Sequence, residues 1–582
     1  MNAVNELLIT PRTDPVYNMH GYLTKVPVAA VMPFIKAYTQ PGGLVVDMFA
    51  GSGMTAVAAK MCGRNAVVSD ISRLGRHIGE GYLLDVPSDE LARVAARIVA
   101  ESREAVGHFY RTIRASDGAE VESIRTVWTF LYRCQACDAV VNYYALLRAA
   151  GWDSRETRCA SCGHQFAKRG AEVLGEEPAL VVVWGEQGKQ TEQMVSEYDL
   201  HQLINADRAD FRRLIPGARI SPEREMYRRS ALEKWGLTDT RAFFSQRNSA
   251  VLYDLWTRIN SIGDESIRKK LLFVFTAILP RASKRYQWSH KAPLNAANQT
   301  YYIAPIFYEW NVYDLFTRKV GAAIKSDKFI ATGVVGNAKQ KYITQSASNL
   351  AHIASESVDY IFTDPPFGSN IFYADMNLFQ ECWLGGTFTN VDLEAVVKTG
   401  GTKADREEAK LGYERMLTEA FREARRILKP NGVLSVVFGN SKGEIWAVAQ
   451  RAFWESGFTE KPESICVLDK GQRSIKGLAS GRESVATLDL IVTFRKKTGA
   501  PATALVDTFE PERLIQKAVE AIDNLDGSTT SHVYLEVLRA AMHSGVNLAS
   551  IDLADVLGHV ARRGYLPDPR SGRLVRQLVP KV

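Results

Sequence analysis

A short apolar segment that runs into a glycine-rich turn and then into a helical pattern constrains the fold of this chain most. Residues 44–48 predict a buried strand, residues 49–55 include Gly51 and Gly53, and residues 56–61 continue with a helical pattern. A strand, a tight turn and a helix in immediate succession begin a βαβ unit, in which glycines let a ligand approach the backbone. We therefore expect an α/β domain with a ligand at this turn.

Acidic residues belong to the first two predicted strands. Asp47 lies in the first strand, and Asp70 follows a second strand over residues 65–69, at about the position expected of an acid that binds ribose. The Gly-x-Gly spacing is shorter than the fingerprint for a diphosphate, and the turn has no P-loop lysine. A nucleoside without a diphosphate therefore fits better than NAD or ATP, and a tight turn without a ligand is the alternative.

A second motif, residues 364–367, follows another predicted buried strand over residues 358–363. It contains one carboxylate, two prolines and one aromatic ring. The carboxylate can accept hydrogen bonds, the prolines restrict the backbone, and the ring can stack on a flat group. This combination suits the binding of an aromatic amine, and the alternative is a chance turn at the end of a strand.

Both motifs resemble those of the amino-methyltransferases of DNA. Residues 47–55 resemble their S-adenosylmethionine-binding motif, residues 364–367 resemble their catalytic motif, and residues 25–27 resemble the segment that precedes the cofactor motif. The resemblance implies a Rossmann-like methyltransferase fold with a doubly wound, mostly parallel sheet, in which the strands before the two motifs are neighbours. In such a fold both motifs serve one site.

The same resemblance implies a role for each matching residue. Asp47 and the turn from Phe49 to Gly53 would lie against the methionine part of the cofactor, and Asp70 would hold the ribose hydroxyls. The full set of cofactor-binding candidates is Lys25, Asp47, Phe49, Ala50, Gly51, Gly53, Thr55 and Asp70. The catalytic candidates are Asp364, Pro365, Pro366 and Phe367.

Four of the seven cysteines form two close pairs. These four are Cys134, Cys137, Cys159 and Cys162. Two CxxC pairs at this separation predict a structural Zn²⁺ ribbon, because each pair presents two thiolates and the four close a tetrahedral site. A closed site leaves no position for water, so we expect the zinc to stabilise the fold and take no part in catalysis. His164 is expected to be a bystander.

The positive charge of the chain is concentrated in its middle. Residues 205–345 contain 24 Lys and Arg against 12 Asp and Glu, while the whole chain carries only +7. Aromatic residues are interleaved with these cations, a composition that suits double-stranded DNA as a partner. A solvated helical surface or a structural spacer is the alternative.

The expected division of the chain has six parts. These are a cofactor-binding half (1–85), a helical connection (86–132), a zinc ribbon (133–166), a basic helical insertion as the candidate target-recognition region (167–343), a catalytic half (344–497) and a C-terminal helical domain (498–582). The C-terminal part carries Arg562 and Arg563, which suit contact with DNA, a partner subunit or a second copy of the chain. A small helical cap is the alternative.

Composition excludes few classes of protein. The chain has 582 residues, of which 46% are hydrophobic and 24% charged, as in ordinary globular proteins. Its apolar runs are too short for a membrane helix, and its first residues lack a signal-peptide pattern. We therefore expect a cytoplasmic protein without a membrane partner.

The combination of motifs narrows the resemblance to the zinc-ribbon-containing adenine-specific DNA methylases, over about residues 15–496. Two positions depart from that pattern: Phe367 replaces the commoner tyrosine, and Met54 stands where threonine is frequent. The expected function is S-adenosylmethionine-dependent methylation of the adenine amine in DNA, with base flipping. The alternatives are a methyltransferase of the same fold that acts on the cytosine amine, RNA or a protein amide, and a non-enzymatic zinc-containing nucleic-acid-binding protein.

Overall fold

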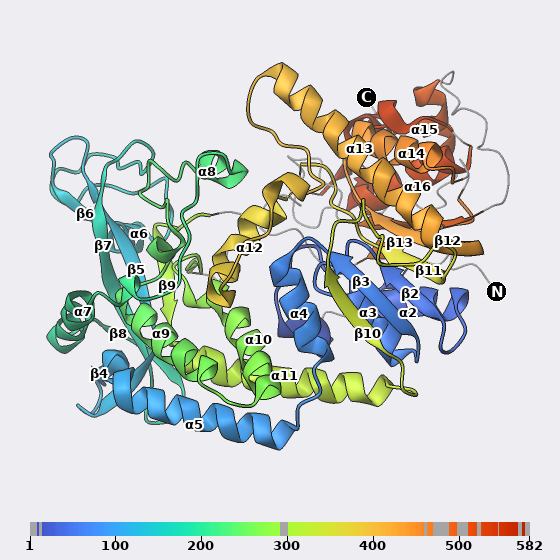
Figure 1. Cartoon of the computed structure of the whole chain (residues 1–582). Helices are drawn as coiled ribbons and strands as arrows, with labels where there is room; N and C mark the ends of the chain where they lie inside the picture. Colours follow the sequence, from blue (N-terminus) through green and yellow to red (C-terminus); the bar gives the residue numbers. More distant parts are fainter. Residues whose placement is uncertain are drawn as a thin grey trace, which may run out of the picture. The chain divides into compact units, whose positions relative to one another are not determined.

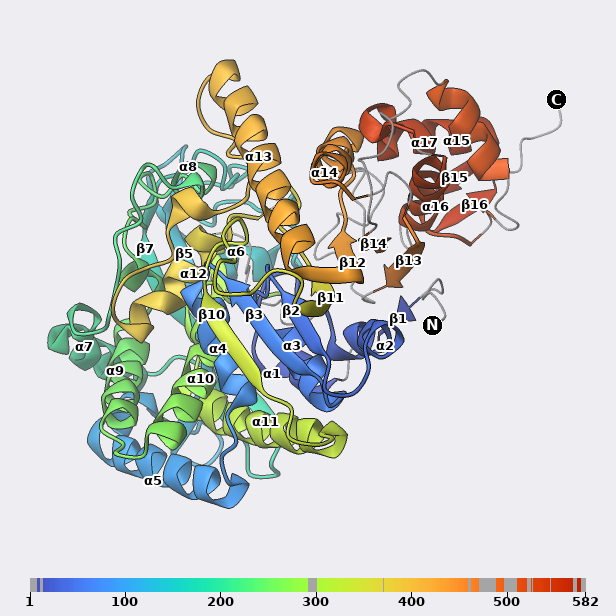
Figure 2. The ribbon, with the colours of Figure 1, turned by 45° about the vertical axis from the view of Figure 1, so that its right-hand side comes forward.

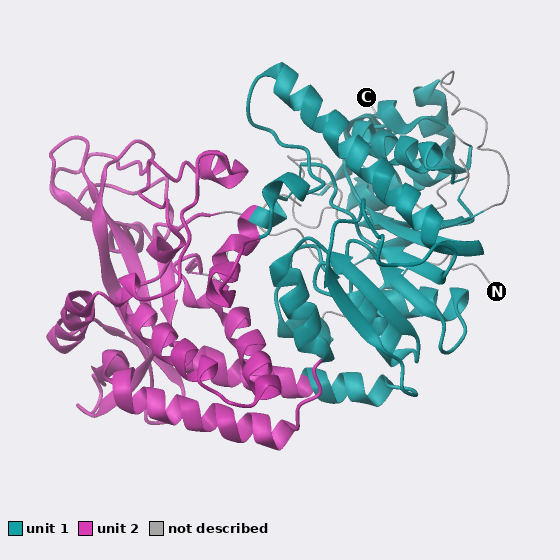
Figure 3. Cartoon of the chain, viewed as in Figure 1, with its two compact units in different colours: residues 1–83, 326–374, 389–582 teal, residues 84–325, 375–388 magenta. Residues whose placement is uncertain are grey.

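The strand before the glycine-rich turn and the strand before Asp364 are neighbours in one eight-stranded sheet. The computed structural model describes residues 8–10, 14–290, 301–369, 371–458, 462–469, 488–496, 510–520, 525, 527–544, 546–568 and 573–576. The chain divides into two units (Figures 1 and 3). Unit 1 contains residues 1–83, 326–374 and 389–582, and unit 2 contains residues 84–325 and 375–388.

The eight-stranded sheet belongs to unit 1 and has the order β1-β13-β14-β12-β11-β2-β3-β10. Its strands are β1 (Leu8–Ile9), β2 (Leu44–Asp47), β3 (Asn65–Asp70), β10 (Gln340–Thr344), β11 (Val358–Thr363), β12 (Leu428–Phe438), β13 (Ser464–Asp469) and β14 (Asp489–Arg495). β14 is antiparallel to both of its neighbours, and the other pairs are parallel. Figure 2 shows β10, β3, β2 and β11 side by side. This mixed, mostly parallel sheet is consistent with the predicted methyltransferase fold.

Helices cover both faces of this sheet, as a doubly wound arrangement requires. On one face, the rings of Tyr360 and Phe362 in β11 contact Tyr38 and Phe34 of α2. On the other face, Ile361 joins the core formed with α13 and α14. The main helices of unit 1 are α1 (Pro15–Met19), α2 (Val28–Tyr38), α3 (Met54–Met61), α4 (Arg73–Leu83), α13 (Lys403–Ile427) and α14 (Gly443–Glu455), with a 3-10 turn η5 (Val391–Leu393).

The C-terminal segment packs into the core of unit 1. It contains α15 (Pro511–Glu520), α16 (Thr530–His543), the turn η6 (Leu548–Ser550), α17 (Leu553–Arg562) and the hairpin of β15 (Tyr565–Pro567) and β16 (Leu574–Arg576). The backbone N–H of Gly443 in α14 donates to Asp552 Oδ1 at 2.7 Å, and Gln450 Nε2 donates to the Val546 carbonyl at 2.9 Å. These contacts attach the C-terminal helices to α14.

Unit 2 is built on a second sheet in which β4, β5, β7 and β8 are consecutive and β6 and β9 also pair with β5. Its strands are β4 (Arg111–Ile113), β5 (Glu120–Arg133), β6 (Val140–Asn142), β7 (Val173–Trp184), β8 (Gln190–Met194) and β9 (Ile306–Trp310). Its helices are α5 (Ser88–Val106), η1 (Gly107–Tyr110), α6 (Tyr143–Ala149), α7 (Glu197–Ala209), η2 (Phe211–Arg213), α8 (Glu225–Arg229), η3 (Thr240–Phe243), α9 (Gln246–Asn260), α10 (Glu265–Ala282) and η4 (Cys382–Leu384). α11 (Val312–Gly333) and α12 (Tyr373–Glu381) each cross from one unit to the other along the chain.

The predicted helical connection over residues 86–132 is wrong in its second half. The helix α5 ends at Val106, and β5 then runs for 14 residues from Glu120 to Arg133. β5 is rich in β-branched and aromatic residues, which pack well in a pleated sheet, and it lies between β7 and β9. For the same reason the insertion over residues 167–343 is a mixture of strands and helices, and the prediction of a helical insertion holds only for parts such as α9 and α10.

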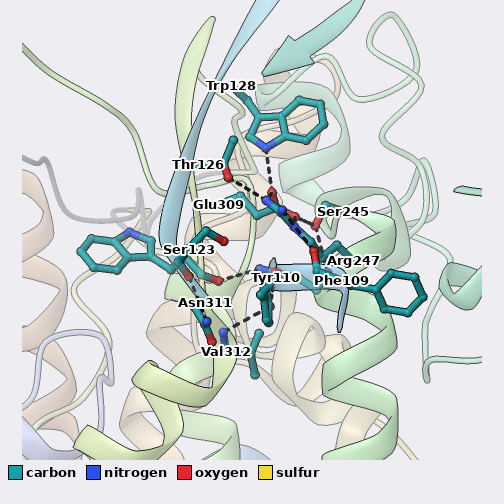
Figure 4. A network of polar contacts seen from close by, with 12 residues as sticks. Phe109, Tyr110, Ser123, Thr126, Trp128, Ser245, Arg247, Glu309, Asn311 and Val312 are labelled. Atoms are coloured by element: carbon teal, nitrogen blue, oxygen red, sulfur yellow. Dashed lines mark hydrogen bonds and ion pairs between the residues drawn. The ribbon is translucent and has the colours of Figure 1, made fainter. Parts of the chain in front are cut away.

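A buried polar network joins β5, β9 and α9 in unit 2 (Figure 4). The guanidinium of Arg247 forms an ion pair with Glu309 and donates to Thr126 Oγ1 at 2.7 Å. Trp128 Nε1 donates to Glu309 Oε2 at 2.8 Å, and Ser245 also donates to this carboxylate. Since a buried charge is costly unless it is paired and hydrogen-bonded, this network satisfies the one carboxylate that β9 places inside unit 2.

Across the described ranges of the chain, we find no helix that combines the length and the apolar character needed to span a membrane.

Candidate functional site

The two sequence motifs meet where β2 and β11 end side by side. In this parallel pair Tyr360 lies opposite Val45 and Ile361 opposite Val46. Thr363, the last residue of β11, donates from Oγ1 to Asp47 Oδ1 at 2.8 Å and accepts a hydrogen bond from the Phe49 N–H at 3.1 Å. The residue directly before Asp364 is therefore bonded to the cofactor motif.

Asp47 is a buried carboxylate with several donors around it. Besides Thr363, the Thr55 hydroxyl donates to Asp47 Oδ2 at 2.6 Å and the Phe49 N–H donates to Oδ1 at 3.1 Å. Burial raises the pKa of Asp47 from 3.8 to about 7, although the hydrogen bonds from Thr55, Thr363 and Phe49 oppose this shift. The negative charge of Asp70 adds to the increase. A cation or donor from a ligand would therefore stabilise the ionised form of Asp47.

The glycine-rich turn is closed by its own backbone and by Asp70. Gly51 and Gly53 have φ angles of 49° and 76°, in the left-handed region that favours glycine. The Gly53 N–H donates to the Ala50 carbonyl at 2.7 Å, and the Gly51 N–H donates to Asp70 Oδ2 at 2.8 Å. The carboxylate of Asp70 thus fixes the turn.

Three residues that the sequence did not indicate support this turn. The Tyr342 hydroxyl donates to the Gly51 carbonyl at 2.6 Å. A Cβ atom at Gly75 would lie 2.4 Å from the Gly51 carbonyl oxygen, and one at Gly79 would lie 2.6 Å from the Tyr342 ring. Both glycines belong to α4, so their lack of a side chain lets this helix approach the turn. These contacts depend on where α4 and β10 meet the turn, so no local sequence pattern marks them.

The ammonium group of Lys25 forms hydrogen bonds with α1, with the residue that follows it and with α4. It donates to the carbonyls of Val16, Tyr17 and His20 at 2.8–3.2 Å and to the Tyr82 hydroxyl at 3.1 Å. The side chain is only 4% exposed. These contacts hold the segment around α1 against α4, so any part of Lys25 in cofactor binding would come through the position of this segment.

The Asp-Pro-Pro-Phe motif of residues 364–367, the acceptor motif, is held in place by hydrogen bonds to its backbone. The Tyr413 hydroxyl donates to the Pro366 carbonyl at 2.7 Å, and Asn440 Nδ2 donates to the Phe367 carbonyl at 3.1 Å. The Phe367 ring lies 5.1 Å from that of Phe438 at an angle of 54°. Asp364 and Phe367 are each half-buried, and Pro365 is buried. The motif is thus a rigid loop whose carboxylate and ring are partly accessible.

Two tyrosines link the acceptor motif to the cofactor turn within unit 1. The rings of Tyr22 and Tyr373 stack with centroids 6.3 Å apart, and a Cβ atom at Gly51 would lie 2.9 Å from the Tyr22 ring. The Tyr373 hydroxyl is hydrogen-bonded to Thr24 Oγ1 at 2.7 Å. Burial and then the charge of Asp364 raise the pKa of Tyr373. The charge of Asp364 therefore acts on Tyr373, whose stacking partner Tyr22 lies next to the turn at Gly51.

The four paired cysteines converge in unit 2. Their sulfur atoms all lie within 4.8 Å of one another, with Cys134 Sγ 3.9 Å from Cys162 Sγ and Cys137 Sγ 3.8 Å from Cys159 Sγ. Four thiolates at the usual Zn–S distance of about 2.3 Å stand about 3.8 Å apart in a tetrahedron, so this donor set fits zinc. In the parts of the chain that the structure describes, the cluster consists of these cysteines alone.

The two CxxC loops have the same backbone bonds. The Cys134 N–H donates to the Ala139 carbonyl, five residues on, and the Cys134 carbonyl accepts from the Asp138 N–H. Cys159 repeats both bonds with His164 and Gly163. Thus His164 contributes its carbonyl to the second loop while its side chain is exposed.

Comparison with known proteins finds a family model that is similar to one segment of unit 1. Residues 6–76 match the model of the N6/N4 methyltransferase family described as "DNA methylase". This range contains β2, β3 and the glycine-rich turn. The similarity to the N6/N4 DNA methylase family is therefore limited to this segment of the chain. The family name covers the N6 amine of adenine and the N4 amine of cytosine alike.

One curated relative and two solved structures are similar to parts of this chain. "Putative methylase YubD" of Escherichia coli (strain K12) is 46% identical over 63 residues, which are 11% of this chain and 28% of that protein. The match thus spans less than a third of the relative. Two crystal structures of TTHA0409, a "Putative DNA Modification Methylase" from Thermus thermophilus, align over 40% of this chain and 97% or 95% of theirs, with 15% or 16% identity and TM-scores of 0.17.

Proposed function

We propose that this chain is an S-adenosylmethionine-dependent DNA methyltransferase that methylates the exocyclic amine of adenine in double-stranded DNA. The observation that carries the proposal is the contact between Thr363 and Asp47. It joins a cofactor motif of the N6/N4 methylase type to the Asp-Pro-Pro-Phe motif at the carboxyl ends of neighbouring strands. Ligands of open α/β sheets bind at such strand ends.

The residues of the turn suit the proposed cofactor. Burial raises the pKa of Asp47, so the positive charge of the methionine part would stabilise its ionised form. Asp70 has the position in the sequence that is expected of an acid facing a ribose. The backbone of Gly51 and Gly53 lets the ligand come close. When bound, S-adenosylmethionine supplies an electrophilic methyl group on a sulfonium.

The acceptor motif would orient the amine. The lone pair of the adenine amine is delocalised into the ring, so the amine is a weak nucleophile. The carboxylate of Asp364 and a carbonyl of Pro365 or Pro366 would accept its two N–H bonds and direct the lone pair at the methyl group. The amine would lose one proton as it is methylated, and the carboxylate of Asp364 would accept this proton and pass it to solvent. Phe367 would stack on the base.

The target base must leave the helix for this reaction, because its amine is otherwise paired. Burial of Pro365 and the bonds from Tyr413 and Asn440 keep the acceptor loop fixed before the base arrives. A loop fixed in advance loses little freedom on binding. The tyrosine pair Tyr22 and Tyr373 would flank the same region. The motif is therefore suited to hold an extruded base.

We further propose that the four cysteines of unit 2 hold one structural zinc ion. All four donors are used within the cluster, so the ion has no open position for water or substrate. Its role would be to keep the two CxxC loops together next to β5 and β6.

The decisive experiment is mass spectrometry of nucleosides after DNA has been incubated with the protein and cofactor carrying a labelled methyl group. We expect the label in N6-methyl-2′-deoxyadenosine from the DNA. Label in N4-methyl-2′-deoxycytidine would show that the acceptor is the cytosine amine and not the adenine amine. Label in RNA or protein only, or none at all, would overturn the proposal and favour the alternative acceptors or a binding protein without catalysis.

A further inference from the structure

The paired strands β5 and β9 of unit 2 have two faces. Charged groups are neutralised within the protein on one face but not on the other. One face carries Thr126 and Glu309, which lie opposite each other and share the neutralised network with Arg247. The other face carries Arg125 and Trp310, which also lie opposite each other. The first face is satisfied within the protein, and the second collects positive charge.

Three arginines surround the ring of Trp310 on that second face. Their guanidinium carbons lie 4.9 Å (Arg125), 5.6 Å (Arg281) and 5.4 Å (Arg318) from its centroid. They come from β5, α10 and α11, so three separate elements direct positive charge at one point. We call this set, Arg125, Arg281 and Arg318 around Trp310, the arginine cluster.

Aromatic and backbone groups hold these arginines in place. Arg125 also lies over the Tyr308 ring at 5.4 Å, and Arg281 lies over the Tyr286 ring at 5.0 Å and donates to its hydroxyl at 3.3 Å. Arg318 donates to the backbone carbonyl of Asp314 at 3.1 Å. Cation–π contacts orient guanidinium groups without neutralising them.

The carboxylates near the arginine cluster do not pair with it. The charge of Asp314 acts on Arg318, and the charge of Glu192 acts on Tyr308. Over the described part of the chain, neither forms an ion pair with the three guanidiniums. Burial lowers the pKa of Arg318, the negative charge of Asp314 opposes this shift, and the charges of Arg281 and Arg125 lower the pKa further. The three guanidiniums therefore repel one another, against the attraction between Asp314 and Arg318.

Two donors in the arginine cluster also have unused hydrogen-bonding capacity. Within the described residues, Arg125 Nε and Trp310 Nε1 are buried and have no acceptor. Trp310 is only 7% exposed, and a buried donor without an acceptor is costly. Arg318 is exposed and Arg125 and Arg281 are half-buried, so the arginine cluster is open to an anion from solvent.

We propose that the arginine cluster binds phosphate groups of the DNA backbone. Planar guanidiniums match phosphate oxygens in geometry and charge, and an anion beside them would reduce the repulsion among the three arginines. This inference rests on the proposed function for its choice of DNA as the anion. It assigns a contact to Arg125, which lies outside the insertion predicted to recognise the target.

The test measures DNA binding without cofactor. A fluorescein-labelled 20-base-pair duplex is titrated by anisotropy over a series of NaCl concentrations, with the full-length wild type and the triple variant R125Q/R281Q/R318Q. If each guanidinium holds one phosphate, the slope of log K against log[salt] should fall in magnitude by about 3. The loss of affinity should be similar for duplexes of different sequence, because phosphates carry no base identity.

The matched control is R93Q/R111Q/R213Q, which removes the same charge from unit 2. Each of these exposed arginines pairs with its own carboxylate: Glu90, Glu120 and Asp210. We expect this control to keep almost the full wild-type slope. An equal loss in both variants, or an unchanged slope in the arginine-cluster variant, would overturn the inference.

A single variant, Arg318→Gln, guards against misfolding because its side chain is exposed. It should reduce the slope by about 1 while the thermal unfolding midpoint stays at the wild-type value. Methylation of DNA with an unaltered slope in all variants would leave the proposed function intact and reject the arginine cluster. If the protein methylates no nucleic acid but its arginine-cluster variants bind DNA more weakly, the arginine cluster would be supported and the proposed function would be rejected.

Discussion

Thr363 Oγ1 donates a hydrogen bond of 2.8 Å to Asp47 Oδ1 across 316 positions of sequence. The same hydroxyl accepts from the Phe49 N–H, so it serves both the buried acid and the start of the glycine-rich turn. Since Asp364 is the next residue, a shift of the cofactor turn is transmitted directly to the acceptor motif. This bond helps to align the two halves of the proposed site.

Replacement of Thr363 by valine should weaken both stability and cofactor binding. Valine keeps the volume but removes the hydroxyl, so the Phe49 N–H loses one acceptor and Asp47 loses one donor. Thr363 is fully buried, and we expect a loss of about 1–3 kcal/mol in the free energy of unfolding. Urea unfolding measures this loss, and calorimetric titration with S-adenosylmethionine measures the weaker affinity.

Thr493→Val is the matched control for this substitution. Thr493 is equally buried in the same sheet, and its hydroxyl bonds to Ser435 at 2.8 Å, far along the chain from either motif. It should lower stability by a similar amount without a change in cofactor affinity. Equal effects of the two variants on cofactor affinity would show that Thr363 does not align the site.

The buried Asp47 should make stability depend on pH. Its pKa is about 7 in the folded chain and near the ordinary value of 3.8 in the unfolded chain. The folded chain thus binds this proton more tightly, so the contribution is full below about pH 4 and is lost as the pH rises through 7, on the order of 1.4 kcal/mol per unit. The free energy of unfolding of the wild type, minus that of Asp47→Asn, should therefore fall between pH 5 and 7. Parallel pH profiles would contradict the raised pKa.

The strands of unit 1 follow from local sequence, because their apolar runs end in turn residues. The pairing of β2 with β11 confirms the predicted neighbours, although residues 84–325 leave the sheet between them. Thr363, Tyr342 and Gly75 were missed for a different reason. Their contacts with the turn depend on where β11, β10 and α4 come together, and nothing next to them in sequence marks that position.

β5 was predicted to be helical because the spacing of its apolar residues fits neither a helix nor a strand throughout. Residues 88–106 have a clear helical pattern, and the residues after them have a similar composition. The change to a strand is indicated only by β-branched and aromatic residues such as Val127 and Trp128. The sequence also indicated a basic middle segment without showing which cations stay unpaired. That distinction depends on the register of β5 and β9, which places Arg125 and Glu309 on opposite faces.

Removal of the Asp364 carboxylate should abolish methyl transfer and leave cofactor binding intact. Asp364→Ala takes away an acceptor for the amine, while the bonds among Asp47, Thr55 and Thr363 do not involve its side chain. We expect a fall in turnover of at least about 10²-fold, the scale for the loss of one positioned electrostatic group. Tritium transfer to DNA and cofactor titration check the two parts separately. Wild-type turnover would refute the assigned role.

Zinc removal should destabilise unit 2. We expect one zinc ion per chain by plasma mass spectrometry, and a chelator should release it, lower the unfolding midpoint and expose four more thiols to a thiol reagent. Cys137→Ser should reduce the metal content, whereas Cys62→Ala, which changes a cysteine outside the cluster, should not. Four reactive thiols in the untreated native protein would argue against a metal site.

Replacement of Arg247 or Glu309 alone should reduce the free energy of unfolding far more than replacement of both. Each side chain is at most 5% exposed, so Arg247→Met leaves a buried carboxylate without its cation and should reduce the free energy of unfolding by about 3–5 kcal/mol. Glu309→Gln should have a comparable effect, and the double variant should cost much less than the sum, because no lone charge is left. The exposed pair Arg111 and Glu120 is the control, with an expected coupling of at most about 1 kcal/mol. Chemical denaturation of all variants in a double-mutant cycle gives both couplings. Additive effects at Arg247 and Glu309 would mean that the network in Figure 4 does not act as one unit.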